Sequence, residues 1–256
     1  FELAEKMTRH ALKSGAELVT DAVVSVERRP DGWFTVTTES GEPYQAPAVI
    51  LTAGGTPVKL GVPGELEYAG EGVPYCAVCD GHFFRGEVVA VVGGGDAACE
   101  EAEFLTRYAS RVHIVHRRHE FRASKIIQQR VFANPKIEVV WDSVVERIEG
   151  NGGAVRHIAL RNVGTGATSR LPVGGVFVFV GFKPNTGVVK GHSTHDEGGY
   201  FITDANMMSS IPGLFVAGDV RAQVTRQITT AVGDATTAAM AVSKYLDQLK
   251  AGKAGG

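Results

Sequence analysis

Cysteine is scarce in this chain of 256 residues, which contains only Cys76, Cys79 and Cys99. A small secreted scaffold held by disulfides needs a denser and even-numbered set, so the sequence excludes that class. Long apolar runs are also lacking: the stretch GGVFVFVGF at 174–182 has the length of a strand, far short of the ~20 residues of a membrane-spanning helix. The sequence therefore predicts an ordinary globular protein with one large domain or two medium ones.

Charge of one sign is lacking as well. The formal net charge is −2, with 21% charged and 44% hydrophobic residues, so no nucleic acid or anionic membrane is predicted as a partner. No charged-then-apolar leader opens the chain, which favours a cytoplasmic location. Since the chain starts at Phe1, inside an amphipathic helical pattern ending near Gly15, we expect a segment ahead of it.

The hydrophobic patterns alternate between strand and helix through the middle of the chain. A strand–helix–strand unit is predicted at 87–92, 96–108 and 111–116. Around it the sequence predicts further strands and helices: strands at 18–29, 33–39, 46–55, 136–141, 174–182 and 214–217, helices at 121–132 and 229–250, and a polar hairpin region at 143–170. The turn-forming segments Gly61–Gly64 and Lys183–Asn185 are candidate hinges.

A glycine-rich turn joins the first strand of this unit to its helix. Gly93, Gly95 and Ala98 fit the G-x-G-x-x-G/A dinucleotide fingerprint, and Asp96 opens the helix. The fingerprint alone can mark a mere turn, but here a strand precedes it and a helix follows it. In that context the small residues allow a pyrophosphate to approach the helix N-terminus, so the sequence predicts a nucleotide site.

Basic residues follow the second strand of the unit, where an NAD site would carry a carboxylate. This chain has His116, Arg117 and Arg118 there, with Arg122 close behind. Guanidinium groups pair with a 2′-phosphate, which a carboxylate would repel. A solvated basic edge is the alternative; the position of the residues favours NADP.

The pair Cys76 and Cys79 forms a C-x-x-C motif with three possible roles. A zinc site would need more ligands, and no suitably spaced histidine pair accompanies the motif, so no metal is predicted. A structural disulfide is disfavoured in a reducing compartment. A redox-active dithiol fits best, with the adjacent Asp80 either a proton donor or a turn residue.

Four segments together resemble one family: CAVCDG, VVGGGDAACEEA, HRRHEFRA and GLFVAGDV followed by RQITTAVGDA. They resemble the low-molecular-weight thioredoxin reductases in order and spacing over essentially the whole chain. The resemblance implies an α/β fold with two Rossmann-like, three-layer ββα nucleotide-binding domains. The NADPH domain (65–184) would be inserted in a split FAD domain (1–64 and 185–256), which is truncated at its N-terminus because the family's first glycine fingerprint is not found.

The resemblance also implies the reaction: electrons would pass from NADPH through FAD and the Cys76–Cys79 dithiol to a thioredoxin-like protein, in a homodimer. Cys79 would lie nearer the flavin, Cys76 would attack the substrate disulfide, and Asp80 would act as the general acid. Six positions match the family's flavin site: Gly54, Gly218, Asp219, Arg226, Gln227 and Ile228.

The sequence leaves three other functions open. One is the flavin reductase component of an alkyl hydroperoxide reductase system. Another is a non-catalytic nucleotide-binding relative, which would need no dithiol, and a third is a reductase with another electron donor, such as ferredoxin. Arg117 and Arg118 disfavour that last reading.

Overall fold

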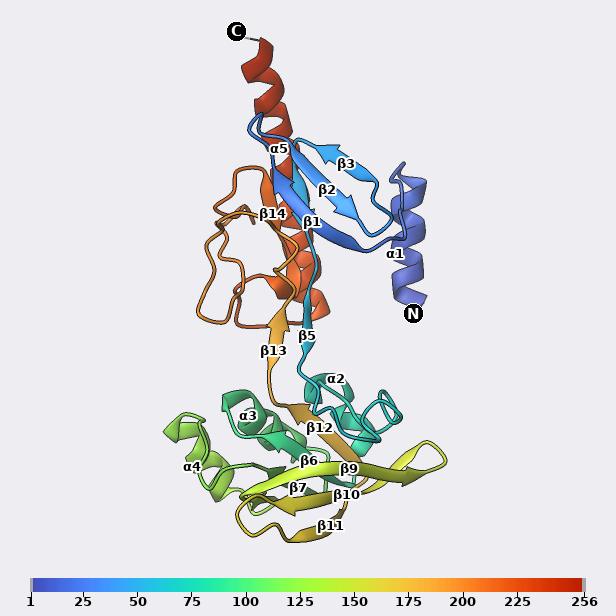
Figure 1. Ribbon diagram of the computed structural model, residues 1–256, viewed down its shortest axis with the longest axis vertical. Helices are drawn as coiled ribbons and strands as arrows, with labels where there is room; N and C mark the ends of the chain where they lie inside the picture. The colour runs from blue at the N-terminus through green and yellow to red at the C-terminus, as the bar shows by residue number, and fades with distance from the viewer. Residues whose placement is uncertain (1, 255–256) are drawn as a thin grey trace. The chain divides into compact units, whose positions relative to one another are not determined.

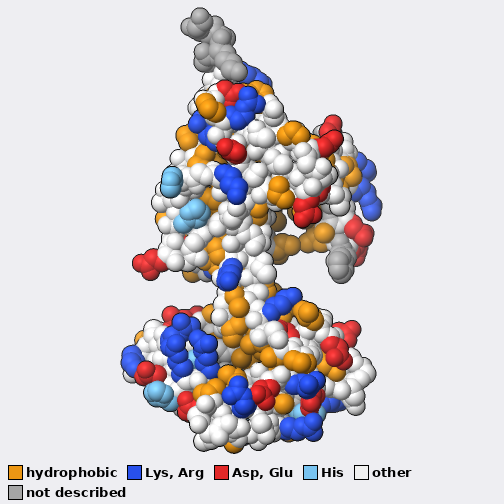
Figure 2. Space-filling view, in the orientation of Figure 1, with side chains coloured by type: hydrophobic (Ala, Val, Ile, Leu, Met, Phe, Trp, Pro, Cys, Tyr) orange, Lys and Arg blue, Asp and Glu red, His pale blue; other side chains and the backbone are white. Residues whose placement is uncertain are grey.

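The computed structural model describes residues 2–254 and divides the chain into two compact units (Figure 1). Unit 1 comprises Phe1–Gly55 and Pro184–Gly256, and unit 2 is the continuous segment Thr56–Lys183. On the face that Figure 2 shows, charged side chains of both signs are spread over each unit, in line with the small net charge. In the part of the chain that is described, no helix has the length and apolar character to cross a bilayer.

Unit 2 is built on a four-stranded parallel sheet in the order β12-β6-β7-β8. Its strands are β6 (Val88–Gly93), β7 (Arg111–Val115), β8 (Ile137–Val140) and β12 (Gly175–Phe179). One face packs on α3 (Asp96–Leu105) and α4 (Lys125–Ala133). The other packs on an antiparallel sheet of β9 (Ser143–Asn151), β10 (Ala154–Asn162) and β11 (Thr168–Pro172). Figure 1 shows these three layers.

The burial of β6 explains its sequence. Alternate residues of this strand enter opposite cores: Val89 and Val91 pack with the helices, and Ala90 and Val92 with the antiparallel sheet. A strand covered on both faces reads as a continuous apolar run, as VVAVVG does. The predicted α/β class and three-layer arrangement are confirmed in this unit.

The segment leading into unit 2 is fastened by Glu65, which is buried. Its carboxylate accepts hydrogen bonds from the backbone N–H groups of Leu60 (2.9 Å) and Gly61 (2.7 Å) and from the hydroxyl of Tyr75 (3.0 Å). The candidate hinge Gly61–Gly64 is therefore tied into unit 2. The chain passes from unit 1 to unit 2 earlier in the sequence than this segment, between Gly55 and Thr56. It returns to unit 1 between Lys183 and Pro184.

Unit 1 combines small sheets with helices. It holds α1 (Glu2–Lys13) and an antiparallel sheet of β1 (Val23–Arg28), β2 (Phe34–Thr38) and β3 (Pro43–Ala46). The strand β4 (Val49–Leu51) pairs in parallel with β14 (Leu214–Val216), which leads into the short helix η2 (Gly218–Val220) and, further along, α5 (Ile228–Ala254). At the crossing, β5 (Gly55–Pro57) pairs with β13 (Phe182–Pro184).

Three local details differ from the sequence expectations. The predicted strand at 46–55 is interrupted: this range holds the last residue of β3 (Pro43–Ala46), all of β4 (Val49–Leu51) and the first residue of β5 (Gly55–Pro57). The polar region 143–170 forms two long strands and a third that reaches Pro172. The dithiol motif lies at the start of a short helix, α2 (Ala77–Asp80), which the short helix η1 (Gly81–Phe84) follows, and no periodicity in the sequence predicted either helix.

Candidate nucleotide and dithiol sites

Gly93 ends β6 at a point where the backbone and the following helix come very close. Its φ is +155°, and a Cβ atom there would lie 2.5 Å from the carbonyl oxygen of Phe179 and 2.7 Å from the Cβ of Ala98. Both contacts are too short for any side chain. Gly93 and Ala98 thus let α3 pack directly against the sheet, as a dinucleotide-binding turn requires.

The next two glycines differ in what surrounds them. A Cβ at Gly94 would lie 2.3 Å from the imidazole ring of His116, whereas a Cβ at Gly95 would meet nothing within 4 Å. Gly95 is the N-cap of α3, where unpaired backbone N–H groups and the helix dipole favour an anion. The space over Gly95 is therefore open to a phosphate group.

His116 lies beneath this turn. Its side chain is buried, its Nε2 lies 3.0 Å from the carbonyl oxygen of Glu120, and burial lowers the pKa of the imidazole. The ring packs closely against Gly94, so His116 shapes the turn. It also lines a pocket next to the turn.

The basic loop after β7 is fastened across the glycine turn. The N–H of Arg122 donates to the carbonyl of Gly94 (2.8 Å), and the N–H of Ser124 donates to the Asp96 carboxylate (2.6 Å). This brings three exposed arginines, Arg117, Arg118 and Arg122, to the glycine turn. A pocket of about 390 Å³ is lined by these arginines together with Gly93, Gly94 and the apolar ends of the strands.

The two cysteines of the C-x-x-C motif form a disulfide bond, with their Cα atoms 5.3 Å apart. Cys76 is the N-cap of α2, and its Sγ accepts the backbone N–H of Cys79 at 3.1 Å. Cys79 is the more exposed of the two, and Asp80 is partly exposed beside it. No group of three or more His, Cys, Asp and Glu residues able to hold a metal occurs within residues 2–254.

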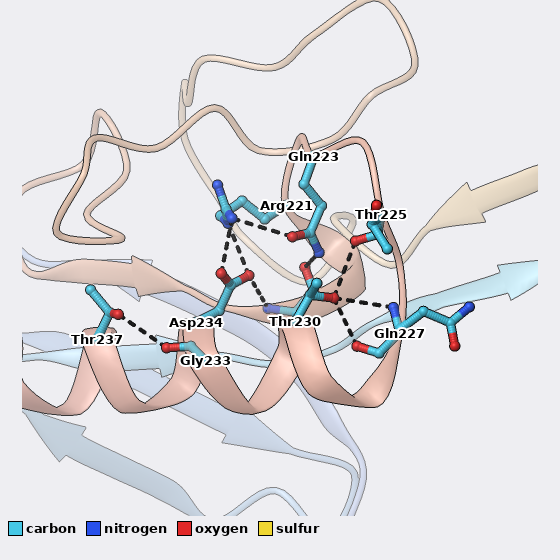
Figure 3. A network of polar contacts seen from close by, with 9 residues as sticks. Arg221, Gln223, Thr225, Gln227, Thr230, Gly233, Asp234 and Thr237 are labelled. Carbon is cyan, nitrogen blue, oxygen red and sulfur yellow. Dashed lines mark hydrogen bonds and ion pairs between the residues drawn. The ribbon is translucent and has the colours of Figure 1, made fainter.

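A polar network in unit 1 holds the Gly218–Asp219 corner (Figure 3). Gly218 has a φ of +77°; its N–H donates to Asp234 (3.1 Å), and its carbonyl accepts from the Gln223 amide (3.0 Å). Arg221 binds both oxygens of Asp234, at 2.9 and 3.0 Å. Both peptide groups of Gly218 are thereby fixed, which leaves the partly exposed Asp219 in a defined place. Sequence reasoning missed Arg221, Gln223 and Asp234.

The strip from Arg226 to Ile228 runs into the start of α5. The guanidinium of Arg226 stacks on the ring of Tyr200 at 3.9 Å, and its buried Nε has no hydrogen-bond partner among the described residues. The backbone N–H of Gln227 donates to the Thr230 hydroxyl (3.1 Å), as Figure 3 shows. Ile228 is exposed, and Gly54, with a φ of +60°, faces open space. An unpaired buried donor such as the Arg226 Nε suits a polar ligand.

A profile described as pyridine nucleotide-disulphide oxidoreductase matches residues 3–235. The chain belongs to this family. Within the pyridine nucleotide-disulphide oxidoreductases, thioredoxin reductases of Listeria innocua and Treponema pallidum are both 43% identical to it, over 249 and 250 residues. These alignments cover 97% and 98% of this chain and 77% and 80% of the relatives.

Solved structures agree. The crystal structure of a thioredoxin reductase from Streptococcus pyogenes superposes with a TM-score of 0.89 at 47% identity, covering 96% of this chain and 80% of that one. A thioredoxin reductase from Giardia duodenalis gives the same TM-score at 36% identity. The fold class predicted from the sequence is thus confirmed, and so is the resemblance on which it rested.

Proposed function

We propose that the protein is an NADPH-dependent thioredoxin-disulfide reductase that uses FAD. One observation carries the proposal: the single compact unit 2 holds both a disulfide on a short helix and a glycine turn bordered by three arginines. A sensor of nucleotides would need no dithiol, and an NAD-linked enzyme would place an acidic residue where Arg117 and Arg118 stand.

Unit 2 supplies the groups that would hold NADPH. The open space beside Gly95, at the start of α3, suits the pyrophosphate. Arg117, Arg118 and Arg122 suit the 2′-phosphate, because planar guanidinium groups bind phosphate oxygens in pairs.

Unit 1 supplies groups that fit the flavin. The open Gly54, the fixed corner at Gly218 and Asp219, and the strip Arg226, Gln227 and Ile228 would bind it, with the unpaired Nε of Arg226 as a donor. When bound, FAD accepts a hydride and delivers two electrons to a disulfide. Tyr200 and Thr230 keep Arg226 and Gln227 in place for this role.

The dithiol performs the exchange with thioredoxin. The resemblance assigns the attack to the Cys76 thiolate: a bond forms between its sulfur and one substrate sulfur, the substrate S–S bond breaks, and the departing sulfur takes a proton from Asp80. The Cys79 thiol then gives its proton to the Asp80 carboxylate and attacks Cys76, which restores the Cys76–Cys79 disulfide and releases the second substrate sulfur as a thiolate. Electrons and protons balance, since one disulfide is reduced and one is formed, and Asp80 regains the proton that it gave.

Three properties of the protein stay predictions. The domain limits 1–64, 65–184 and 185–256, the homodimer and the cytoplasmic location all rest on the resemblance and on the sequence patterns. The predicted turnover requires the dithiol to meet first the electron donor and then the substrate, and rotation of the inserted domain would provide this. Light scattering of the purified protein measures the oligomeric state directly.

The decisive experiment is NADPH oxidation by the purified chain supplied with FAD and a bacterial thioredoxin, with insulin as the terminal disulfide. We expect oxidation that depends on thioredoxin and is much slower with NADH. A peroxiredoxin with hydrogen peroxide in place of thioredoxin tests the alkyl hydroperoxide alternative. Turnover with the peroxiredoxin but not with thioredoxin would overturn the proposal.

A further inference from the structure

The nucleotide pocket of unit 2 contains a fourth basic side chain, Lys59. This lysine lines the same cavity of about 390 Å³ as Arg117, Arg118 and Arg122, and every lining residue belongs to unit 2. No aspartate or glutamate is among the lining residues. The cavity therefore gathers four lysine and arginine side chains without a carboxylate to balance their charge.

These four side chains differ from most other arginines of unit 2 in their pairing. Five arginines elsewhere in the unit pair with glutamate side chains: Arg111, Arg130, Arg147, Arg161 and Arg170. None of the four basic side chains in the pocket forms an ion pair within residues 2–254. Because like charges repel one another, a pocket of this kind suits a ligand that carries several negative charges.

The backbone on either side of Lys59 is held in place by hydrogen bonds. The N–H of Val58 donates to the carbonyl of Gly181 (2.9 Å), and the N–H of Leu60 donates to the buried carboxylate of Glu65 (2.9 Å). The side chain of Lys59 is exposed. On binding an anion, this lysine would lose conformational freedom mainly in its side chain, because its backbone is already ordered.

The order of the strands places Lys59 on one side of the glycine turn and the arginines on the other. In the sheet β12-β6-β7-β8, the turn at Gly93 ends β6, and the basic loop with Arg117 follows β7. Lys59 lies near the end of β12, because Gly181, which accepts the hydrogen bond from Val58, follows that strand. The pyrophosphate of a dinucleotide lies at the glycine turn, and hence between the lysine and the arginines.

We propose that Lys59 binds the pyrophosphate of the nucleotide, while the arginines bind its 2′-phosphate. This deepens the proposed function and rests on it. The ammonium group of lysine suits a pyrophosphate because it is a compact charge with several N–H donors, which can reach more than one phosphate oxygen. Since NADPH and NADH share the pyrophosphate, Lys59 contributes to the affinity for both nucleotides and to the preference for neither.

The test is the affinity of the full chain for three nucleotides, measured by titration calorimetry without added FAD. The salt concentration is about 0.15 M, at which the screening length is about 8 Å. NADPH carries the pyrophosphate and the 2′-phosphate, NADH carries only the pyrophosphate, and 2′-AMP carries only the 2′-phosphate. The variant is Lys59→Gln. Its control, Arg156→Gln, removes an exposed positive charge near the β9–β10 turn, at the opposite end of β9 from the pocket residue Ser143.

We expect Lys59→Gln to bind NADPH and NADH about tenfold more weakly than the wild type does, because one charge-assisted hydrogen bond to the pyrophosphate is lost. Its affinity for 2′-AMP should be unchanged. Arg156→Gln should bind all three nucleotides as the wild type does. Unchanged affinity for NADH, weaker binding of 2′-AMP by Lys59→Gln, or an equal loss in Arg156→Gln would each overturn the proposal.

Acetylation of lysines in the wild-type chain gives a second measurement, which needs no variant. Saturating NADH should slow the acetylation of Lys59, followed by mass spectrometry, whereas 2′-AMP should leave the rate unchanged. Equal rates with and without NADH would overturn the proposal. A chain that responds to Lys59→Gln as expected, but oxidises no NADPH with FAD and thioredoxin, would count against the proposed function alone.

Discussion

Cys99 and the Cys76–Cys79 pair stand close together in the sequence, yet their surroundings differ completely. Cys99 is fully buried on α3, and burial, followed by the charges of Asp96 and Glu100, raises the pKa of its thiol to about 11. Such a thiol carries almost no thiolate at neutral pH. Chemical modification of the folded protein therefore reports on the dithiol alone.

Serine substitutions test the dithiol at the level of single atoms. Cys79→Ser and Cys76→Ser should each abolish thioredoxin reduction, because exchange needs both sulfurs, while leaving NADPH affinity unchanged. Stopped-flow or steady-state assays with thioredoxin measure the first effect, and nucleotide titration the second. Cys99→Ser serves as the control and should keep its activity. Full activity in Cys76→Ser would contradict the assigned roles.

Arginine substitutions test the nucleotide preference. Arg117→Ala and Arg118→Ala should each weaken binding of NADPH and leave NADH unaffected, because only NADPH carries the 2′-phosphate. Losing one charge-assisted hydrogen bond costs about 1.5–3 kcal/mol, or about tenfold to a hundredfold in affinity. Titration calorimetry with both nucleotides measures this, and Arg130→Ala on α4 is a control of equal charge. Equal losses for NADH would show that these arginines act only as general charges.

At the scale of elements, the strand–turn–helix from β6 to α3 gives two neighbouring glycines different roles. Gly94→Ala should lower the free energy of unfolding by about 1–3 kcal/mol, because its Cβ would press on the buried ring of His116. Gly95→Ala faces open space and should fold normally, yet lose NADPH affinity because its methyl group occupies the place of a phosphate. Urea unfolding and nucleotide titration separate the two effects. Normal nucleotide binding by Gly95→Ala would contradict the assigned phosphate site.

Elements with strong local patterns could be predicted from the sequence, and those fixed by distant partners could not. The run VVAVVG and the glycine turn identify β6 and the start of α3, because burial on both faces leaves a clear apolar pattern. The four-residue helix α2 is too short for any period. The bond between Arg221 and Asp234 and the stacking of Arg226 on Tyr200 depend on the folded chain, and composition gives no sign of either.

At the scale of the whole molecule, unit 2 is one continuous piece of chain. Its two hydrophobic cores contain residues of 56–183 only. A domain with a hydrophobic core built from its own residues can fold alone. A fragment of residues 56–183 should therefore unfold cooperatively and bind NADPH about as well as the full chain, while reducing no thioredoxin with NADPH. Circular dichroism and nucleotide titration check this; a fragment without a cooperative transition would refute it.

The strands at which the chain enters and leaves unit 2, β5 and β13, are paired with each other. To the host fold, the whole insert is thus equivalent to a short loop, whatever its length. Recombination between the genes of two relatives at these two points would exchange a complete cassette. The nucleotide preference of the donor and its thiol chemistry would be inherited together, in a single event, and the recipient would keep its own flavin pocket.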